Sequence, residues 1–233
     1  MDKPIVVFDL ETDSIDPDTA NPIQIGAIAI DPIRLCIIPN SEFYSWCRPD
    51  NLDVPTYYDQ NKSTIDFHLR NYGMKKDEFL TKLRESPSEK QVFESFREYL
   101  GKYHTKETSQ TIFSAPILAG YNSFGFDFPI LDRLCKKYGC VDKNGKQKLY
   151  FSRDSEDIMK MVIEWLAPTR EVKSYSMDTI REYFGMPEGQ SHDALFDVQQ
   201  EALLLIKFKK LYKRFAGQIK FKGSFAKEDS NAA

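Results

Sequence analysis

The sequence predicts an α/β fold that begins with an antiparallel meander, and three observations support this. Residues 4–11 are apolar at positions facing both sides of a strand, which is typical of a strand covered on both faces. Similar runs follow at 23–30 and at 35–38, the latter continued at 42–46, after connections short enough for antiparallel pairing. The second half alternates helical patterns with one more strand, at 116–122.

Helical periodicity is clearest at 86–103, where apolar residues repeat along one stripe. The spacing predicts further helices at 128–139 and 155–168. Another helix is predicted at 176–187, with its end at Gly185, because glycine often follows the last turn of a helix. The last predicted helix is the longest and runs from about Asp193 to Arg214.

Length and composition bound the organisation of the chain. Its 233 residues, of which 41% are hydrophobic, are sufficient for one domain with a substantial core. We expect a single domain over 1–216 with a polar, helical insertion at about 50–114. Residues 217–233 are polar and basic without a clear pattern, so we expect a flexible tail. The net charge of −3 neither indicates nor excludes a nucleic-acid partner.

The cysteines and the apolar patterning of the chain indicate the cellular compartment that we expect. Cys36, Cys47, Cys135 and Cys140 are scattered in a chain too long to need disulfides, which favours reduced thiols. No CxxC or nearby histidine completes a metal pair with Cys135 and Cys140. The sequence shows neither a secretory leader nor an apolar run of membrane-spanning length. We therefore expect a soluble cytoplasmic protein without a membrane partner.

Two carboxylates directly follow the apolar core of the first strand. Asp9 and Glu11 are two residues apart, so both project from the same face of a strand, about 6.5–7 Å apart. No Lys or Arg occurs between Lys3 and Arg34, and a buried carboxylate without a positive neighbour is costly. On its own, this DxE pattern is more typical of a strand that runs out into a solvated acidic turn than of a functional site.

Two later carboxylates also lie between large apolar residues. Asp127 is flanked by phenylalanines, and Asp197 lies between Phe196 and Val198. A structural alternative exists for each: Asp127 as the N-cap of a helix starting near Pro129, and Asp197 as an exposed acid near a helix N-terminus. Asp193 fits the second role better, as the N-cap or first-turn residue of the last helix.

Four acids without basic neighbours are best explained by bound cations. Hard divalent ions prefer oxygen ligands, and a pair about 3.5–4 Å apart is the usual device of phosphoryl transfer. The sequence therefore predicts two Mg²⁺ or Mn²⁺ ions at Asp9, Glu11, Asp127 and Asp197. His192 precedes the last helix and is a candidate general base, although a surface histidine is the structural alternative. His68 and His104 lie in the polar central region without a directly adjacent carboxylate in sequence, and they stay unassigned.

Three segments together resemble a known family. "FDLETD" followed by "IQIGAIAI", then "GYNSFGFDFPIL", then "SHDALFDVQQEALLL" are similar to the three motifs of the DEDDh 3′→5′ exonucleases. These enzymes belong to the DnaQ-like superfamily and have a ribonuclease-H-like fold. The resemblance covers residues 4–48 and 115–210, and it implies a three-layer fold with helices on both sides of a mixed sheet whose first three strands are antiparallel.

The resemblance also implies residue roles. Asp9, Glu11, Asp127 and Asp197 would be metal ligands and His192 the general base. Thr12 and Asn122 would help to hold the terminal nucleotide or the motif loop. Two positions depart from the pattern: Asp13 stands where many relatives have a small or hydroxyl residue, and Asn122 precedes Asp127 by five residues where many relatives have four.

The expected activity is hydrolysis of single-stranded DNA or RNA from the 3′ end, with DNA favoured and 5′-monophosphates released. Tyr121, Phe124 and Phe126 are candidates for base stacking, with core packing as the alternative. The basic run of the last helix and tail could follow a phosphate backbone or form a solvated helix face. Rival functions are an exoribonuclease, and a catalytically silent nucleic-acid-binding or polymerase-associated subunit. The sequence indicates no oligomeric state.

Overall fold

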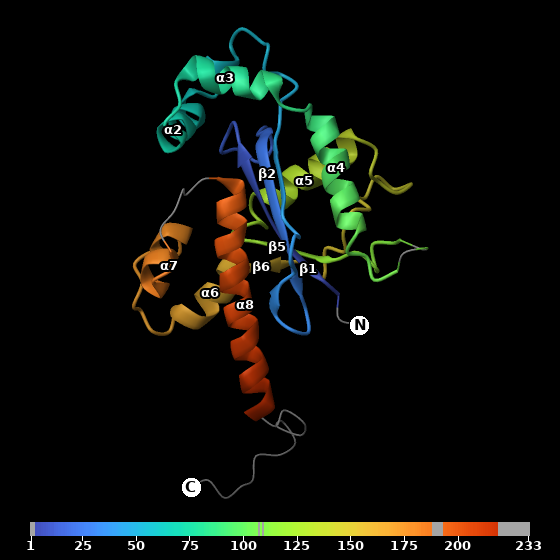
Figure 1. Cartoon of the computed structure of the whole chain (residues 1–233), viewed down its shortest axis with the longest axis vertical. Coiled ribbons are helices and arrows are strands. Elements are labelled where there is room, and N and C mark those ends of the chain that lie inside the picture. Colours follow the sequence, from blue (N-terminus) through green and yellow to red (C-terminus); the bar gives the residue numbers. More distant parts are fainter. Residues whose placement is uncertain (1–2, 107, 109, 188–192, 219–233) are drawn as a thin grey trace, which may run out of the picture.

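The computed structural model describes residues 3–106, 108, 110–187 and 193–218, and it shows a sheet between two layers of helices (Figure 1). The strands are β1 (Ile5–Thr12), β2 (Pro22–Asp31), β3 (Cys36–Ile37), β4 (Phe43–Trp46), β5 (Ile117–Gly120) and β6 (Glu156–Asp157). The helices are α1 (Tyr57–Gln60), α2 (Lys62–Tyr72), α3 (Lys76–Glu85), α4 (Glu89–Gly101), α5 (Asp127–Lys137), α6 (Ile158–Leu166), α7 (Met177–Phe184) and α8 (Ala194–Gln218).

The sheet is mixed, with an antiparallel beginning. Its order is β3-β2-β1-β5-β6, and β4 also pairs with β2. Strand β2 is antiparallel to β1, β3 and β4, whereas β5 is parallel to both β1 and β6. The predicted α/β class and the predicted antiparallel start are therefore confirmed.

The predicted third strand is instead two short strands on the same partner. β3 pairs with the end of β2 at Ile30 and Asp31, and β4 pairs with its beginning. Pro39 lies between the two strands and has no N–H for a ladder bond, and Asn40 has a left-handed φ of 55°. These two residues interrupt the strand that the apolar pattern predicts.

Alternate residues of β1 enter two different cores. The even-numbered side chains pack with α4 and α5, and the odd-numbered ones pack with α6, α7 and α8. The first set is Val6, Phe8 and Leu10, and the second is Ile5 and Val7. Because side chains alternate along a strand, Asp9 and Glu11 continue the face that α8 covers.

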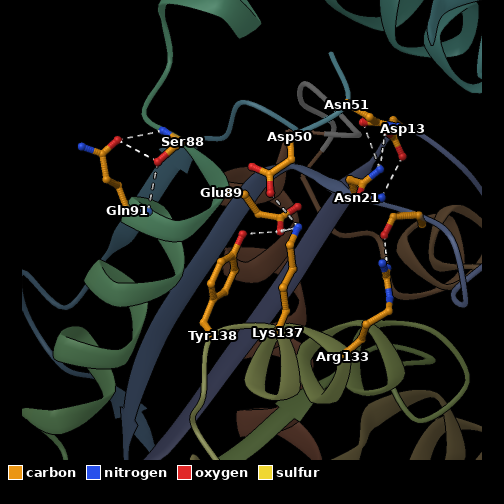
Figure 2. A network of polar contacts seen from close by, with 11 residues as sticks. Asp13, Asn21, Asp50, Asn51, Ser88, Glu89, Gln91, Arg133, Lys137 and Tyr138 are labelled. Carbon is orange, nitrogen blue, oxygen red and sulfur yellow. Dashed lines mark hydrogen bonds and ion pairs between the residues drawn. The ribbon is translucent and has the colours of Figure 1, made fainter. Parts of the chain in front are cut away.

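Helices α1 to α4 lie within the segment predicted as a helical insertion at about 50–114. Figure 1 shows α2 and α3 beyond one end of the sheet, while α4 runs along the face that α5 also covers. Helix α4 starts with a capping box in which Ser88 and Gln91 bond each other's backbone N–H groups (Figure 2). Gly185 ends α7 with a φ of 59°, as predicted.

An ion pair between the exposed Lys137 and the buried Glu89 joins α4 to α5. The Nζ of Lys137 lies 2.5 Å from Glu89 Oε1 and 2.9 Å from Asp50 Oδ2 (Figure 2). The hydroxyl of Tyr138 donates to the same Glu89 oxygen at 2.7 Å. Glu89 is 1% exposed, so these contacts compensate the loss of its hydration and hold the two helices together.

Two predicted boundaries are wrong by a few residues. The helix predicted at 155–168 begins at Ile158, because Glu156 and Asp157 form strand β6 and the Asp157 carboxylate accepts from Met159 N and Lys160 N. Residues 217–218 of the predicted tail belong to α8, and 219–233 lie outside the described residues. Within the described part of the chain, every helix is too short or too polar to cross a membrane.

Candidate metal-binding site

Three of the four predicted metal ligands converge. Asp9 and Glu11 from β1 and Asp197 from α8 each offer a carboxylate oxygen, and these oxygens lie within 4.8 Å of one another. The donors are hard oxygen atoms of carboxylates, which suit Mg²⁺ or Mn²⁺ better than they suit softer metals. This acidic cluster fits the predicted divalent cations.

Strand β2 sets the position of α8 through a glycine and a glutamine. A Cβ atom on Gly26 would lie 2.3 Å from the carbonyl oxygen of Ala194, so only glycine lets the helix approach this closely. Gln24 is fully buried, and its Oε1 accepts from Ala194 N at 3.2 Å. The first turn of α8 therefore lies directly on the sheet, which brings Asp197 to β1.

Asp193 caps α8, as predicted. Its Oδ1 accepts from the backbone N–H groups of Leu195 and Phe196, each at 3.1 Å. Its other oxygen accepts from the hydroxyl of Tyr44 at 3.1 Å. The two acids of the third motif thus have different environments: Asp193 caps the N-terminus of α8, and Asp197 faces the cluster.

Asp127 reaches β1 rather than capping its own helix. The predicted cap is wrong, because α5 already begins at Asp127 and has no side-chain cap. Instead Asp127 Oδ1 accepts from Leu10 N at 3.1 Å, between the two acids of β1. Asp127 is 4% exposed, so this bond places a fourth carboxylate beside the cluster.

A fifth carboxylate, Glu201, was not predicted as a site residue. It is 3% exposed, and its Oε2 accepts from Tyr121 N at 3.2 Å. Glu201 lies one helical turn after Asp197, so both project from the same face of α8. This i, i+4 spacing was the signal in the sequence that could have identified it.

Burial and mutual repulsion raise the pKa of these carboxyls. The pKa of Asp9 is raised well above its usual range by burial first and then by Glu201 and Asp127. Burial followed by Asp197 raises the pKa of Glu11, and burial followed by Asp127 raises that of Glu201. Burial raises the pKa of Asp127 to about 7. The cluster therefore favours protons or cations.

One basic side chain lies inside the cluster. The guanidinium of Arg181, from α7, donates through one nitrogen to Asp197 and through the other to Asp178 at 3.2 Å. Arg181 is 8% exposed. The expectation that these acids lack basic neighbours is therefore wrong for Asp197, because the arginine approaches from a segment distant in sequence.

His68 also approaches the cluster, contrary to the expectation that it lacks carboxylate neighbours. Its Nδ1 lies 3.8 Å from Glu11 Oε2, and its Nε2 lies 2.8 Å from the carbonyl oxygen of Thr12. His68 belongs to α2 of the predicted insertion, 57 positions after Glu11 in the chain. Only the tertiary structure brings the two together.

The cluster opens into a cavity of about 440 Å³. The five carboxylates line it together with Arg181, Tyr121, Asn122 and Phe126. The cavity is large enough to admit a nucleotide-sized group. His192, the predicted general base, lies outside the described residues.

No family model and no curated protein matches the chain. Among solved structures, Escherichia coli exonuclease I in complex with a dT13 oligonucleotide matches with a TM-score of 0.63 and 16% identity. Cell-death related nuclease 4 matches with 0.62 and 15%, and exonuclease I from Methylocaldum szegediense with 0.59 and 18%. The chain has the ribonuclease-H-like fold of these nucleases.

These matches extend over 93%, 90% and 93% of this chain, respectively. They cover 43%, 64% and 45% of the matched chains, so this chain spans less than two thirds of each. The fold predicted from the three motifs is confirmed. Within this fold, the five clustered carboxylates lie on β1, α5 and α8.

In this ribonuclease-H-like fold, Asn122 belongs to a loop held by a buried acid. Asn122 has a left-handed φ of 56°, and its backbone N donates to Asp157 Oδ1 at 3.2 Å. Phe124 N donates to the other oxygen of Asp157, also at 3.2 Å. Asp157 was not predicted as a site residue, because its sequence position was assigned to a helix. It orders the loop that leads to Asp127.

Thr12 and Asp13 have local partners. The hydroxyl of Thr12 donates to Ser14 O at 2.7 Å. Asp13 is 1% exposed and accepts from Asn21 N at 2.7 Å and from its side chain at 3.0 Å (Figure 2). Asp13, which departs from the pattern of the three motifs, therefore stabilises the turn between β1 and β2 through these hydrogen bonds.

The residues predicted to stack on bases, and those of the predicted basic run, differ in their contacts and exposure. Tyr121 donates its hydroxyl to Tyr175 O at 2.6 Å, which agrees with the packing alternative. Phe124 is 38% exposed, so part of its ring remains accessible. The Nζ of Lys160 lies over this ring, 4.6 Å from the centroid. In the basic run, Lys209 pairs with Glu156 at 2.7 Å.

Proposed function

We propose that the protein is a metal-dependent 3′→5′ exonuclease that hydrolyses single-stranded nucleic acid, DNA in preference to RNA, and releases nucleoside 5′-monophosphates. The observation that carries this proposal is the convergence of Asp9, Glu11 and Asp197 within 4.8 Å. The shared fold and the dT13 oligonucleotide bound to E. coli exonuclease I support a single-stranded substrate.

Asp9, Glu11, Asp127 and Asp197 would hold two divalent cations, Mg²⁺ or Mn²⁺. Such a pair, when bound, stabilises negative charge on the phosphate and on the leaving 3′ oxygen. The carboxyls must lose their protons to bind cations, and their raised pKa values make this loss dependent on pH. Glu201 adds negative charge next to the ligands and favours cation binding in the same way.

The remaining roles fall to residues around the cavity. His192 would accept the proton of the attacking water, for which an imidazole is suited near neutral pH. Asn122 lines the cavity and would contact the terminal nucleotide, while Asp157 keeps its loop in place. Thr12 would contribute through its backbone, since its hydroxyl is bonded to Ser14.

The deciding experiment compares DNA and RNA single strands of equal sequence, labelled at the 3′ or the 5′ end. We expect release of mononucleotides from the 3′ end with Mg²⁺ or Mn²⁺, and none with EDTA. A blocked 5′ end should not matter, whereas a 3′-phosphate or a blunt duplex should slow the reaction. Faster cleavage of RNA would identify an exoribonuclease.

Matched variants separate the active site from contaminating nuclease. Asp197→Asn should abolish turnover, whereas Asp77→Asn, on the exposed face of α3, should retain it. Turnover that persists in EDTA would overturn the metal requirement. Cleavage of a circular single strand would indicate an endonuclease, and binding without cleavage would indicate a catalytically silent protein.

A further inference from the structure

The inserted helices deliver a buried histidine to the end of β1. His68 is 2% exposed, and its ring stacks on Tyr72 at 5.8 Å between centroids with an interplanar angle of 9°. Phe79 of α3 stacks at 6.3 Å with an angle of 10°. The orientation of the imidazole is therefore set by two helices of the insertion.

This orientation supplies a hydrogen-bond donor to the backbone of β1. Thr12 is the last residue of β1 and is opposite Pro22, the first residue of β2. His68 Nε2 lies 2.8 Å from the Thr12 oxygen, and because a carbonyl only accepts, Nε2 carries the hydrogen. The ladder register shifts between Glu11 and Thr12, so this bond holds β1 at its irregular point.

The same ring faces the preceding residue. His68 Nδ1 lies 3.8 Å from Glu11 Oε2, and Glu11 lines the cavity. Tyr72 is close enough for the Glu11 charge to raise the pKa of its phenol, after the larger effect of burial. One histidine thus contacts two consecutive residues of β1, one through its backbone and one through its carboxylate.

We propose that His68 is a positioning residue that holds the Thr12 carbonyl, and through the backbone of β1 the adjacent Glu11 carboxylate, in the geometry needed for metal binding. This rests on the proposed function of the cluster. Groups that orient a metal ligand contribute about 10–100-fold to metal affinity or activity. The helical insertion is then part of the active site, because it carries the residue that orients one of the ligands.

The insertion is built to hold this ring. Phe79 belongs to a small core with Ile65, Leu83 and the β2 residue Ile23, all fully buried. The ring of Trp46, from β4, packs against the rings of Tyr72 and Phe79, with 5.5 Å and 6.0 Å between the ring centroids, respectively. The ring of His68 is therefore supported from the sheet as well as from α3.

Three variants test the positioning role. His68→Phe keeps a stacking ring and removes both nitrogens, His68→Gln can place an amide N–H near the Nε2 position, and His68→Asn places one near Nδ1. His104→Phe is the matched control, since this histidine contacts Ser114, with its Nδ1 3.0 Å from the hydroxyl. The measurements are Mn²⁺ affinity by calorimetry, kcat and KM on single-stranded DNA, and thermal melting, all with the full chain.

At temperatures where it is folded, we expect His68→Phe to bind Mn²⁺ about 10–100-fold more weakly than the wild type. Its kcat should be lower, and its KM should be unchanged. His68→Gln should recover affinity more than His68→Asn does, because the Thr12 bond is the shorter contact. His104→Phe should match the wild type. A His68→Phe variant with wild-type Mn²⁺ affinity and kcat, differing only in melting temperature, overturns the proposal.

The metal titration also separates this proposal from the proposed function. Wild-type protein that binds Mn²⁺ but cleaves no nucleic acid would overturn the exonuclease function, and the affinity of His68→Phe would still decide the role of His68. Wild-type protein that binds no Mn²⁺ would overturn both.

Discussion

The guanidinium of Arg181 donates a hydrogen bond to the carboxylate of Asp197, so α7 places a positive charge inside the acidic cluster. The side chains of Arg181 and Asp197 are 10% and 12% exposed, respectively, which leaves little water to screen them. In the absence of cations, this arginine is the counter-charge of a predicted metal ligand. The two kinds of positive charge therefore compete for one carboxylate.

Replacing this arginine should make the fold more dependent on metal. Breaking one side of a buried pair typically costs roughly 3–5 kcal/mol, so Arg181→Gln should melt at a lower temperature in EDTA. Mn²⁺ should raise its melting temperature more than that of the wild type, because the ion then replaces the lost charge. Asp178→Asn is the control, as the Asp178 side chain is 68% exposed and its pair with Arg181 contributes little. Equal Mn²⁺ shifts in Arg181→Gln and wild type would contradict this competition.

The metal-free protein should lose stability as the pH rises. Asp127 has a folded-state pKa of about 7, above its usual 3.8, and burial raises the pKa of Asp9, Glu11 and Glu201 as well. A carboxyl with a raised folded-state pKa stabilises the fold fully below its unfolded pKa, and this contribution disappears as the pH passes the folded value. In EDTA, the free energy of unfolding in urea should therefore be higher at pH 5 than at pH 8.

Asp127 alone should account for about 3 kcal/mol of that difference. Asp127→Asn should reduce the pH dependence, since asparagine does not titrate. Saturating Mn²⁺ should oppose the trend, because cations bind the deprotonated carboxylates and stabilise the fold more strongly at pH 8. A free energy of unfolding that is equal at both pH values in EDTA would be inconsistent with four carboxyls that are buried and protonated in the folded state.

The neighbours His192 and Asp193 should differ in their effects. His192→Ala should fold, bind Mn²⁺ and lose roughly 10²–10⁴-fold in kcat, as expected for a general base. Asp193→Asn should keep its turnover, because asparagine can accept the same bonds from Leu195 and Phe196 N–H groups. Single-turnover rates and Mn²⁺ titrations of both variants provide the measurement. An inactive Asp193→Asn beside an active His192→Ala would show that the third motif is assigned in the wrong register.

Asp157 should affect substrate binding through the loop that it orders. Its carboxylate accepts from the backbone N–H groups of Asn122 and Phe124 and also caps α6. Asp157→Ala should lower the free energy of unfolding by about 1–2 kcal/mol and raise KM more than it lowers kcat. Glu156→Gln, one residue earlier, is a suitable control because it loses only a partly exposed pair with Lys209. If Asp157→Ala has an unchanged KM, the loop does not contribute to nucleotide binding.

Much of the fold could be predicted because its longer elements have a clear periodicity. The strands 4–11 and 23–30 and the helix at 86–103 all appear close to the predicted positions. Strand β6 contains only two residues, and two residues carry no periodicity. Its existence depends on the neighbouring strand β5 that it pairs with, so local sequence could not predict it.

Some residues of the candidate site could likewise be predicted from the sequence, and others could not. Asp9, Glu11 and Asp197 could be identified because each carboxylate stands among apolar neighbours in sequence, where a charge needs compensation. Arg181 and His68 could not, because their contacts with these acids join segments that are distant along the chain. The sequence therefore indicates which groups need a partner more readily than it indicates the partner.

Two of the five clustered carboxylates, Asp197 and Glu201, belong to α8, the last helix in the described chain. A polypeptide is synthesised from its N-terminus, and its early segments begin to fold during synthesis. A nascent chain can form β1 and β2 while it is still attached to the ribosome, but it lacks the acids of α8. The cluster is complete only after nearly all of this fold has been translated, so an unfinished chain would carry no complete acidic cluster while it lies beside the messenger RNA that encodes it.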